Sequence, residues 1–203
     1  MTEHTARGRP LASSQEALQD AAFELFLENS YAKTTIEHIT QRAGVSRATF
    51  FNYFPAKSDV FWVDLDQALV RLQEELRAHV PLGGRTAQGG LEKVQKALVA
   101  VATELGTDRV PFALTQYELV GSVHELQASA LARFSLQANI ITSFLEDHGL
   151  PTSRARAAAY GCIAAAVSGA QEWAASGTTR APLETYLRAA VDPVIAGFAA
   201  RET

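Results

Sequence analysis

The chain has 203 residues, a mass of 21.9 kDa and 47% hydrophobic residues, which is enough for one large or two small domains and excludes a disordered tail. Its formal net charge of −4 excludes a uniformly basic nucleic-acid coat, so any DNA contact has to come from a local patch. The single cysteine, Cys162, excludes a disulfide framework. The sequence also lacks a signal-peptide pattern and a long apolar run, and together these features favour a cytoplasmic protein.

The apolar residues recur at helical spacing, with Gly and Pro between the segments, and this pattern predicts an all-α fold. A first helix is expected over about 14–29. A second helix is expected to begin at Thr34, because the spacing from Thr34 to Glu37 fits a capping box, and to end at Gly44. Ser46 is expected to cap a short third helix that ends before Pro55.

A longer amphipathic stretch from about Lys57 to Pro81 is expected to connect these three helices to the rest of the chain. The Gly89-Gly90 pair is interpreted as a break. Beyond it, we expect helices over about 91–105, 110–120, 124–148, 154–175 and 183–200.

The segment Thr34–Lys57 has the apolar pattern of a helix-turn-helix, with Gly44 free to take a positive φ in the turn. The positions expected to be buried are Ile36, Ile39, Ala43, Val45, Phe50 and Phe54. The opposite face of the third helix presents Arg47, Ala48, Phe51 and Asn52, which suit entry into a major groove.

The local charge agrees with a DNA-binding segment. Between Tyr31 and Lys57 there are four cations and one carboxylate, a net charge of +3 in a chain of −4. The cations are Lys33, Arg42, Arg47 and Lys57, against Glu37.

The run Gly44–Lys57, GVSRATFFNYFPAK, resembles the DNA-binding segment of the tetracycline-repressor (TetR) family of transcriptional regulators. The resemblance implies about nine helices in two domains. Residues 1–56 would hold a basic arm and the helix-turn-helix, and residues 57–203 would begin with a connecting helix and provide ligand binding and dimerisation. It further implies a homodimer that binds double-stranded DNA at an inverted repeat, most simply as a repressor released by a small molecule.

The same resemblance implies roles for individual residues. Thr49, Tyr53 and Lys57 would contact phosphates, and Arg47, Ala48, Phe51 and Asn52 would enter the groove. Thr35 is assigned to the same interface, and Arg7 and Arg9 resemble an arm along the minor groove. Two alternatives stay open, because Phe51 could instead pack on the first helix and Arg47 could be a solvated residue at a helix start.

The second domain would contain an effector cavity and a dimer face. For the cavity we select Trp62, Phe112, Gln116, Tyr117, Phe134, Gln137, Asn139, Tyr160 and Trp173, whose aromatic members could equally be ordinary core. The absence of a charge cluster among them favours a neutral or mainly hydrophobic effector. The dimer face is assigned to residues of the last two helices, which could alternatively be intramolecular core: Ala157, Gly161, Ala164, Ala165, Ser168, Leu187, Val191, Val194, Ile195 and Phe198.

No pattern of an enzyme, metal site or cofactor site is found. Cys162 lies in an alanine-rich run without a neighbouring histidine and is expected to be an inert buried thiol. The histidines are scattered, without the spacing of a helical metal site. The main alternative to a regulator is a helical small-molecule-binding or protein-interaction module that no longer reads DNA. A helical enzyme would require a reactive group that the sequence does not offer.

Overall fold

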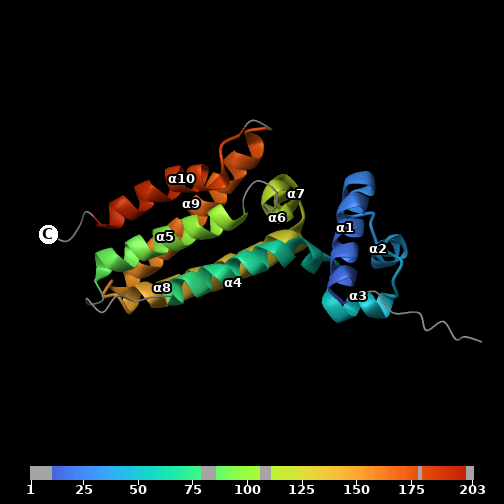
Figure 1. The fold of residues 1–203 in the computed structure, drawn as a ribbon, viewed down its shortest axis with the longest axis horizontal. Coiled ribbons are helices and arrows are strands. Elements are labelled where there is room, and N and C mark those ends of the chain that lie inside the picture. Colours follow the sequence, from blue (N-terminus) through green and yellow to red (C-terminus); the bar gives the residue numbers. More distant parts are fainter. Residues whose placement is uncertain (1–10, 79–85, 106–110, 178–179, 200–203) are drawn as a thin grey trace, which may run out of the picture. The chain divides into compact units, whose positions relative to one another are not determined.

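The computed structural model describes residues 11–78, 86–105, 111–177 and 180–199, in which all regular elements are helical (Figure 1). The all-α prediction is therefore confirmed. Contacts divide the chain into two compact units, Met1–Phe61 and Trp62–Thr203. The predicted domain boundary, between residues 56 and 57, lies at the start of the 3-10 turn η1 (Lys57–Trp62), which precedes the fourth helix. Arg7 and Arg9 lie outside the described residues.

The first unit contains three helices, α1 (Leu11–Asn29), α2 (Ile36–Ala43) and α3 (Arg47–Tyr53). Both α2 and α3 contact α1 and each other. The cap of α2 differs from the prediction: Thr35 rather than Thr34 is the N-cap, and His38 rather than Glu37 completes the capping box. Thr34 is buried instead, and its hydroxyl donates to the carbonyls of Leu25 and Ser30, so it is not available as a cap.

Aromatic and aliphatic side chains fill the core of the first unit. Ile39, Phe50 and Phe54 are buried, as their spacing predicts, whereas Ile36, Ala43 and Val45 are partly buried. The ring of Phe26 stacks on Phe61 at a centroid distance of 5.1 Å and lies at the same distance from Tyr31. This packing joins α1 to the α1–α2 loop and to η1.

The second unit contains the remaining helices. Its elements are α4 (Val63–Arg77), α5 (Ala87–Leu105), α6 (Phe112–Thr115), α7 (Tyr117–Ser122), α8 (His124–Glu146), α9 (Thr152–Ala175) and α10 (Leu183–Ala199). Helix α9 packs against α8 and α10, and α5 packs against α4, α8 and α10 (Figure 1).

The expected break at Gly89-Gly90 is wrong, because both glycines lie inside α5. The hydroxyl of Thr86 accepts from the Gly89 amide, and its carbonyl accepts from the Gly90 amide. A Cβ at residue 90 would lie 2.7 Å from Cβ of His148, so this glycine permits a close approach of α5 to the end of α8.

The single helix expected over 110–120 is instead two short ones, α6 and α7, separated at Gln116, whose φ of −110° and ψ of 38° interrupt the helical path. Val110 lies outside the described residues. The expected helices over 124–148, 154–175 and 183–200 correspond to α8, α9 and α10 with shifts of one or two residues at their ends.

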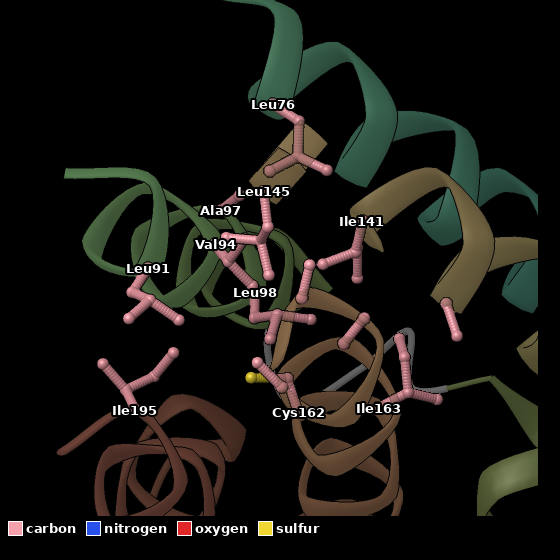
Figure 2. Close-up of a cluster of buried hydrophobic side chains, with 14 of the residues drawn as sticks. Leu76, Leu91, Val94, Ala97, Leu98, Ile141, Leu145, Cys162, Ile163 and Ile195 are labelled. Carbon is pink, nitrogen blue, oxygen red and sulfur yellow. The ribbon is translucent and has the colours of Figure 1, made fainter. Parts of the chain in front are cut away.

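Five helices of the second unit share one apolar core. Figure 2 shows side chains from α4, α5, α8, α9 and α10 converging, among them Leu76, Leu98, Ile141 and Ile195. Cys162 belongs to this cluster and is fully buried, as expected. Burial raises the pKa of its thiol to about 12, because the charged thiolate is poorly solvated there.

Candidate nucleic-acid interface and effector cavity

The turn between α2 and α3 follows from local sequence signals. Gly44 adopts φ of +67°, a left-handed conformation in which glycine is unstrained, and its amide donates back to the carbonyls of Gln41 and Thr40. The hydroxyl of Ser46 then accepts from the Thr49 amide at 3.0 Å and caps α3, as predicted. These two devices fix the direction in which α3 leaves the turn.

Helix α3 buries one face and exposes the other. Phe50 lies in the core, whereas the groove-facing candidates Arg47, Ala48, Phe51 and Asn52 are exposed. Positions 47, 48, 51 and 52 follow one another at helical spacing on that exposed face. The structure therefore brings these four predicted residues together on one surface of the first unit.

The predicted phosphate contacts have more constrained surroundings. Thr49 is partly buried, and its hydroxyl lies 2.8 Å from that of Ser46. The ring of Tyr53, also partly buried, is tilted against Phe54 at a centroid distance of 6.4 Å. Thr35 is exposed, and its hydroxyl accepts from the His38 amide at 3.1 Å to cap α2. The roles of these residues at DNA stay predictions.

Lys57 makes contacts that the sequence did not reveal. Its ammonium donates to the carbonyl of Tyr31 at 2.7 Å and to that of Thr34 at 2.9 Å, and it lies 4.0 Å from the centroid of the Tyr31 ring. These bonds hold the loop between α1 and α2 against η1. A contact from Lys57 to phosphate would come in addition to these bonds or replace one of them.

Replacing Lys57 with methionine, which keeps an unbranched side chain but lacks the ammonium group, is expected to destabilise the first unit by about 1–3 kcal/mol, because the carbonyls of the buried residues Tyr31 and Thr34 lose a charged donor. Urea unfolding followed by circular dichroism measures the change, and Lys33→Met, at an exposed position, is the matched control. Unchanged stability together with weaker DNA binding would show that Lys57 acts on phosphate instead.

Arg42 joins α2 to α1 through two carboxylates. Its guanidinium lies 3.0 Å from Glu24 and 2.7 Å from Glu28. The hydrogen bond from Arg42 lowers the pKa of Glu28, and the bonds from Glu28 and then Glu24 raise the pKa of Arg42. The charge of Arg42 is thus balanced within the unit, and it adds less to a basic patch than its position in the sequence indicates.

Arg47 lies between a carboxylate and an aromatic ring. Its Nη1 is 3.0 Å from Oε1 of Glu37, and its Cζ is 5.6 Å from the centroid of the Phe51 ring. From the sequence alone, Glu37 is only the one carboxylate among the four cations of the segment between Tyr31 and Lys57. The contact depends on the angle between α2 and α3, which no local spacing reveals.

The second unit contains an apolar cavity of about 80 Å³. Most of its lining residues come from α4, α5, α9 and α10, with Phe134 of α8 and, at α6, Pro111 and Leu114. On α4 the lining residues are Leu65, Ala68, Leu69 and Leu72, and the lining side chains from the rest of the described chain are also hydrocarbon. In the sequence, Leu65, Leu69 and Leu72 belong to the apolar stripe of the amphipathic stretch, and a stripe alone does not distinguish a cavity wall from closed core.

Of the nine residues selected for the cavity, Phe134 lines it. Trp62, Gln137 and Trp173 are buried elsewhere in the unit, and Gln137 accepts a hydrogen bond from Gln73 at 3.3 Å. The others lie on partly buried or exposed positions outside the lining: Phe112, Gln116, Tyr117, Asn139 and Tyr160.

The residues selected for the dimer face divide into two groups. Leu187, Val191 and Ile195 are buried in the core of a single chain, so they cannot form an exposed face. Gly161, Ala165, Val194 and Phe198 are partly buried, and a Cβ at residue 161 would lie 3.1 Å from Val194. The residues of the set that are exposed on α9 are Ala157, Ala164 and Ser168.

Among the described residues, no group of three or more His, Cys, Asp or Glu side chains is arranged to hold a metal ion. None of the described helices combines the length and the apolar run that crossing a bilayer requires.

Comparison with known proteins yields two family matches. Residues 18–61 match the model described as bacterial regulatory proteins, tetR family, and residues 89–199 match the model described as MftR C-terminal domain.

The chain is 32% identical over 125 residues to the HTH-type transcriptional regulator TcmR of Streptomyces glaucescens, and this alignment covers 55% of each protein. It is 25% identical over 156 residues to the HTH-type transcriptional activator FasR of Mycolicibacterium smegmatis, covering 75% of this chain and 68% of FasR. The chain thus spans between about half and two thirds of these relatives.

Among solved structures, a similar one is FadR of Thermus thermophilus, a TetR-family transcriptional repressor determined in complex with lauroyl-CoA. It is 26% identical, with a TM-score of 0.57, and the alignment covers 93% of this chain and 97% of FadR.

Proposed function

Because the chain belongs to the TetR family of bacterial regulatory proteins, we propose that this ligand-responsive DNA-binding regulator is a cytoplasmic repressor that binds an inverted-repeat operator as a homodimer. The observation that supports operator binding is the exposed face of α3, where Arg47 and Asn52 offer donors that suit guanine and adenine edges. Repression rather than activation is favoured by the similarity to FadR, although FasR is an activator.

The test is selection of binding sites from a random double-stranded DNA library by the purified protein at two salt concentrations. We expect enrichment of an inverted repeat with half-sites about one helical turn apart, and an affinity that falls as salt rises. A folded, dimeric protein that enriches no sequence would instead favour a helical small-molecule-binding module. Reporter expression from the selected operator then separates a repressor from an activator.

For the dimer, we propose the exposed face of α9 at Ala157, Ala164 and Ser168, whose small side chains permit close approach of a second copy. Two-fold pairing there would present two α3 helices to one duplex. Replacement of Ala164 by glutamate should produce a folded monomer in sedimentation experiments, and a persistent dimer would exclude this face.

For the effector, we propose a molecule with an aliphatic chain. Among the described residues, the cavity lining offers hydrocarbon and no hydrogen-bonding side chain, so a polar group placed against it would lose its hydration without compensation. The acyl chain of the ligand bound to FadR is of this class. Drug-sized ligands occupy pockets of about 300–1,000 Å³, whereas this cavity has about 80 Å³. A long chain therefore requires the walls to move apart.

That movement provides a mechanism for release. Leu65, Leu69 and Leu72 make α4 one wall of the cavity, and Asp66 on the same helix is bound to Arg133 of α8 at 2.7 and 3.0 Å. An effector that binds better when α4 has moved will shift the population toward that state and away from the operator-binding one. An effector with equal affinity for both states would have no effect.

Ala166→Leu is expected to raise the concentration of lauroyl-CoA needed to release the selected operator by at least about tenfold, because the added carbons occupy the cavity that Ala166 lines. Operator affinity without the ligand should stay unchanged. Ala132→Leu, on the exposed surface of α8, is the matched control. Equal responses of both variants would mean that the acyl chain does not enter this cavity.

A further inference from the structure

We propose that Glu37 is a specificity-determining positioning residue, which holds Arg47 toward base edges and away from phosphates. This inference rests on the proposed function, in which Arg47 of α3 enters the major groove. Glu37 itself need not contact DNA, and its effect is exerted through the guanidinium that it binds.

The geometry supports a directed contact. Nη1 of Arg47 lies 3.0 Å from Oε1 of Glu37. Cζ of Arg47 also lies 5.6 Å from the centroid of the ring of Phe51, the residue one helical turn further along α3. The side chains of Arg47 and Glu37 are 60% and 71% exposed, so the pair faces solvent on the surface that would meet DNA. An arginine without such neighbours would sample many rotamers there.

Both residues that contact the guanidinium are attached to well-defined parts of the motif. Glu37 lies in the first turn of α2, next to His38, and the capping box between Thr35 and His38 fixes the backbone at the start of this helix. The ring of Phe51 lies edge-on to Phe50, which is fully buried, with 84° between the two planes. Arg47 thus contacts one residue from each helix of the motif, Glu37 of α2 and Phe51 of α3.

An exposed ion pair of this kind contributes little to folding stability, so its main consequence is expected at DNA. Arginine has five N–H donors, and one contact to Glu37 leaves the guanidinium able to donate to the acceptors of a guanine edge. A phosphate brings a negative charge close to the Glu37 carboxylate, which repels it. The pair should therefore lower affinity for DNA in general while preserving the contact that depends on sequence.

The experiment compares wild-type protein with Glu37→Gln in site selection and in titrations of a random duplex. We expect Glu37→Gln to bind the random duplex several-fold more tightly. The logarithmic salt dependence should steepen by about one unit, since Arg47 can then neutralise one more phosphate. Preference for the base pair that Arg47 contacts should fall at least about threefold. Glu24→Gln is the matched control, because it removes one exposed carboxylate from the same unit while Arg42 keeps Glu28.

Arg47→Ala and the double variant, which combines it with Glu37→Gln, complete a double-mutant cycle. In the background of Arg47→Ala, Glu37→Gln should no longer alter the sequence preference, because its effect passes through the guanidinium. Identical behaviour of Glu37→Gln and Glu24→Gln, or an effect of Glu37→Gln that persists without Arg47, would overturn the inference while leaving DNA binding intact. If Arg47→Ala leaves the preference unchanged, the base-reading assignment of Arg47 fails and this inference with it. If the wild-type protein selects no sequence, the proposed function itself is wrong.

Discussion

Phe50→Ala is expected to destabilise the first unit by about 3–5 kcal/mol and to abolish operator binding, because Phe50 is fully buried and its removal leaves a cavity among Phe51, Phe54 and α1. A loss of this size is a large part of the stability of a typical small domain, about 5–15 kcal/mol. The second unit should remain folded and still bind its effector.

Two spectroscopic signals separate the units in this experiment. Both tryptophans, Trp62 and Trp173, belong to the second unit, so tryptophan fluorescence reports on that unit, whereas circular dichroism reports on helices of both. For Phe50→Ala, urea unfolding should show an early transition by circular dichroism that fluorescence does not show. Phe51→Ala is the matched control, since Phe51 is 46% exposed and its loss should cost little stability. Coincident early transitions by both signals would mean that the units do not unfold separately.

Gly169→Val is expected to destabilise the second unit by about 3 kcal/mol. A Cβ at residue 169 would lie 2.8 Å from the carbonyl oxygen of Tyr186 and 3.3 Å from Cα of Leu187, so the clash is with the backbone of α10, which cannot rotate away. The helices would have to separate. Since Ala170 on α9 and Leu183 and Leu187 on α10 line the cavity, the response to effector should be lost as well.

Thermal unfolding followed by tryptophan fluorescence measures this effect. Gly121→Val is the control, because no atom of the described residues lies within 4 Å of a Cβ at residue 121. The two substitutions add the same side chain, so their difference isolates the close approach of α9 and α10. Equal stability of the two variants would show that α10 adjusts without cost.

The helix-turn-helix could be predicted because its signals are local. The positive φ of Gly44, the Ser46 cap and the spacing of Phe50 and Phe54 each depend on residues within one or two turns, and the structure agrees with all of them. The observed N-cap of α2 is Thr35, one residue after the predicted Thr34. Thr34 is not the cap because its hydroxyl donates instead to the carbonyl of Leu25 in α1, nine residues away in the sequence.

The features that escaped prediction depend on contacts between distant segments. The sequence around Gly90 predicts a helix break. In the structure Gly90 lies within a helix, and a Cβ there would clash with His148, which is distant in the sequence. Most of the cavity lining comes from apolar residues of α4, α5, α9 and α10, whose spacing matches that of closed core, so the sequence alone does not distinguish them from core residues. The pairing of Arg47 with Glu37 likewise follows from the angle between two helices rather than from either helix alone.

The buried thiol of Cys162 has a practical consequence for observing the regulator at work. With a pKa of about 12, only about one thiol in 10⁴ is ionised at pH 8, and burial further restricts access by alkylating reagents. A cysteine introduced at the exposed position of Asn52 would therefore react alone, without removal of the native one. The proposed homodimer, labelled in this way, would hold one spin label on each α3, and the separation of the two labels could be followed as effector is added.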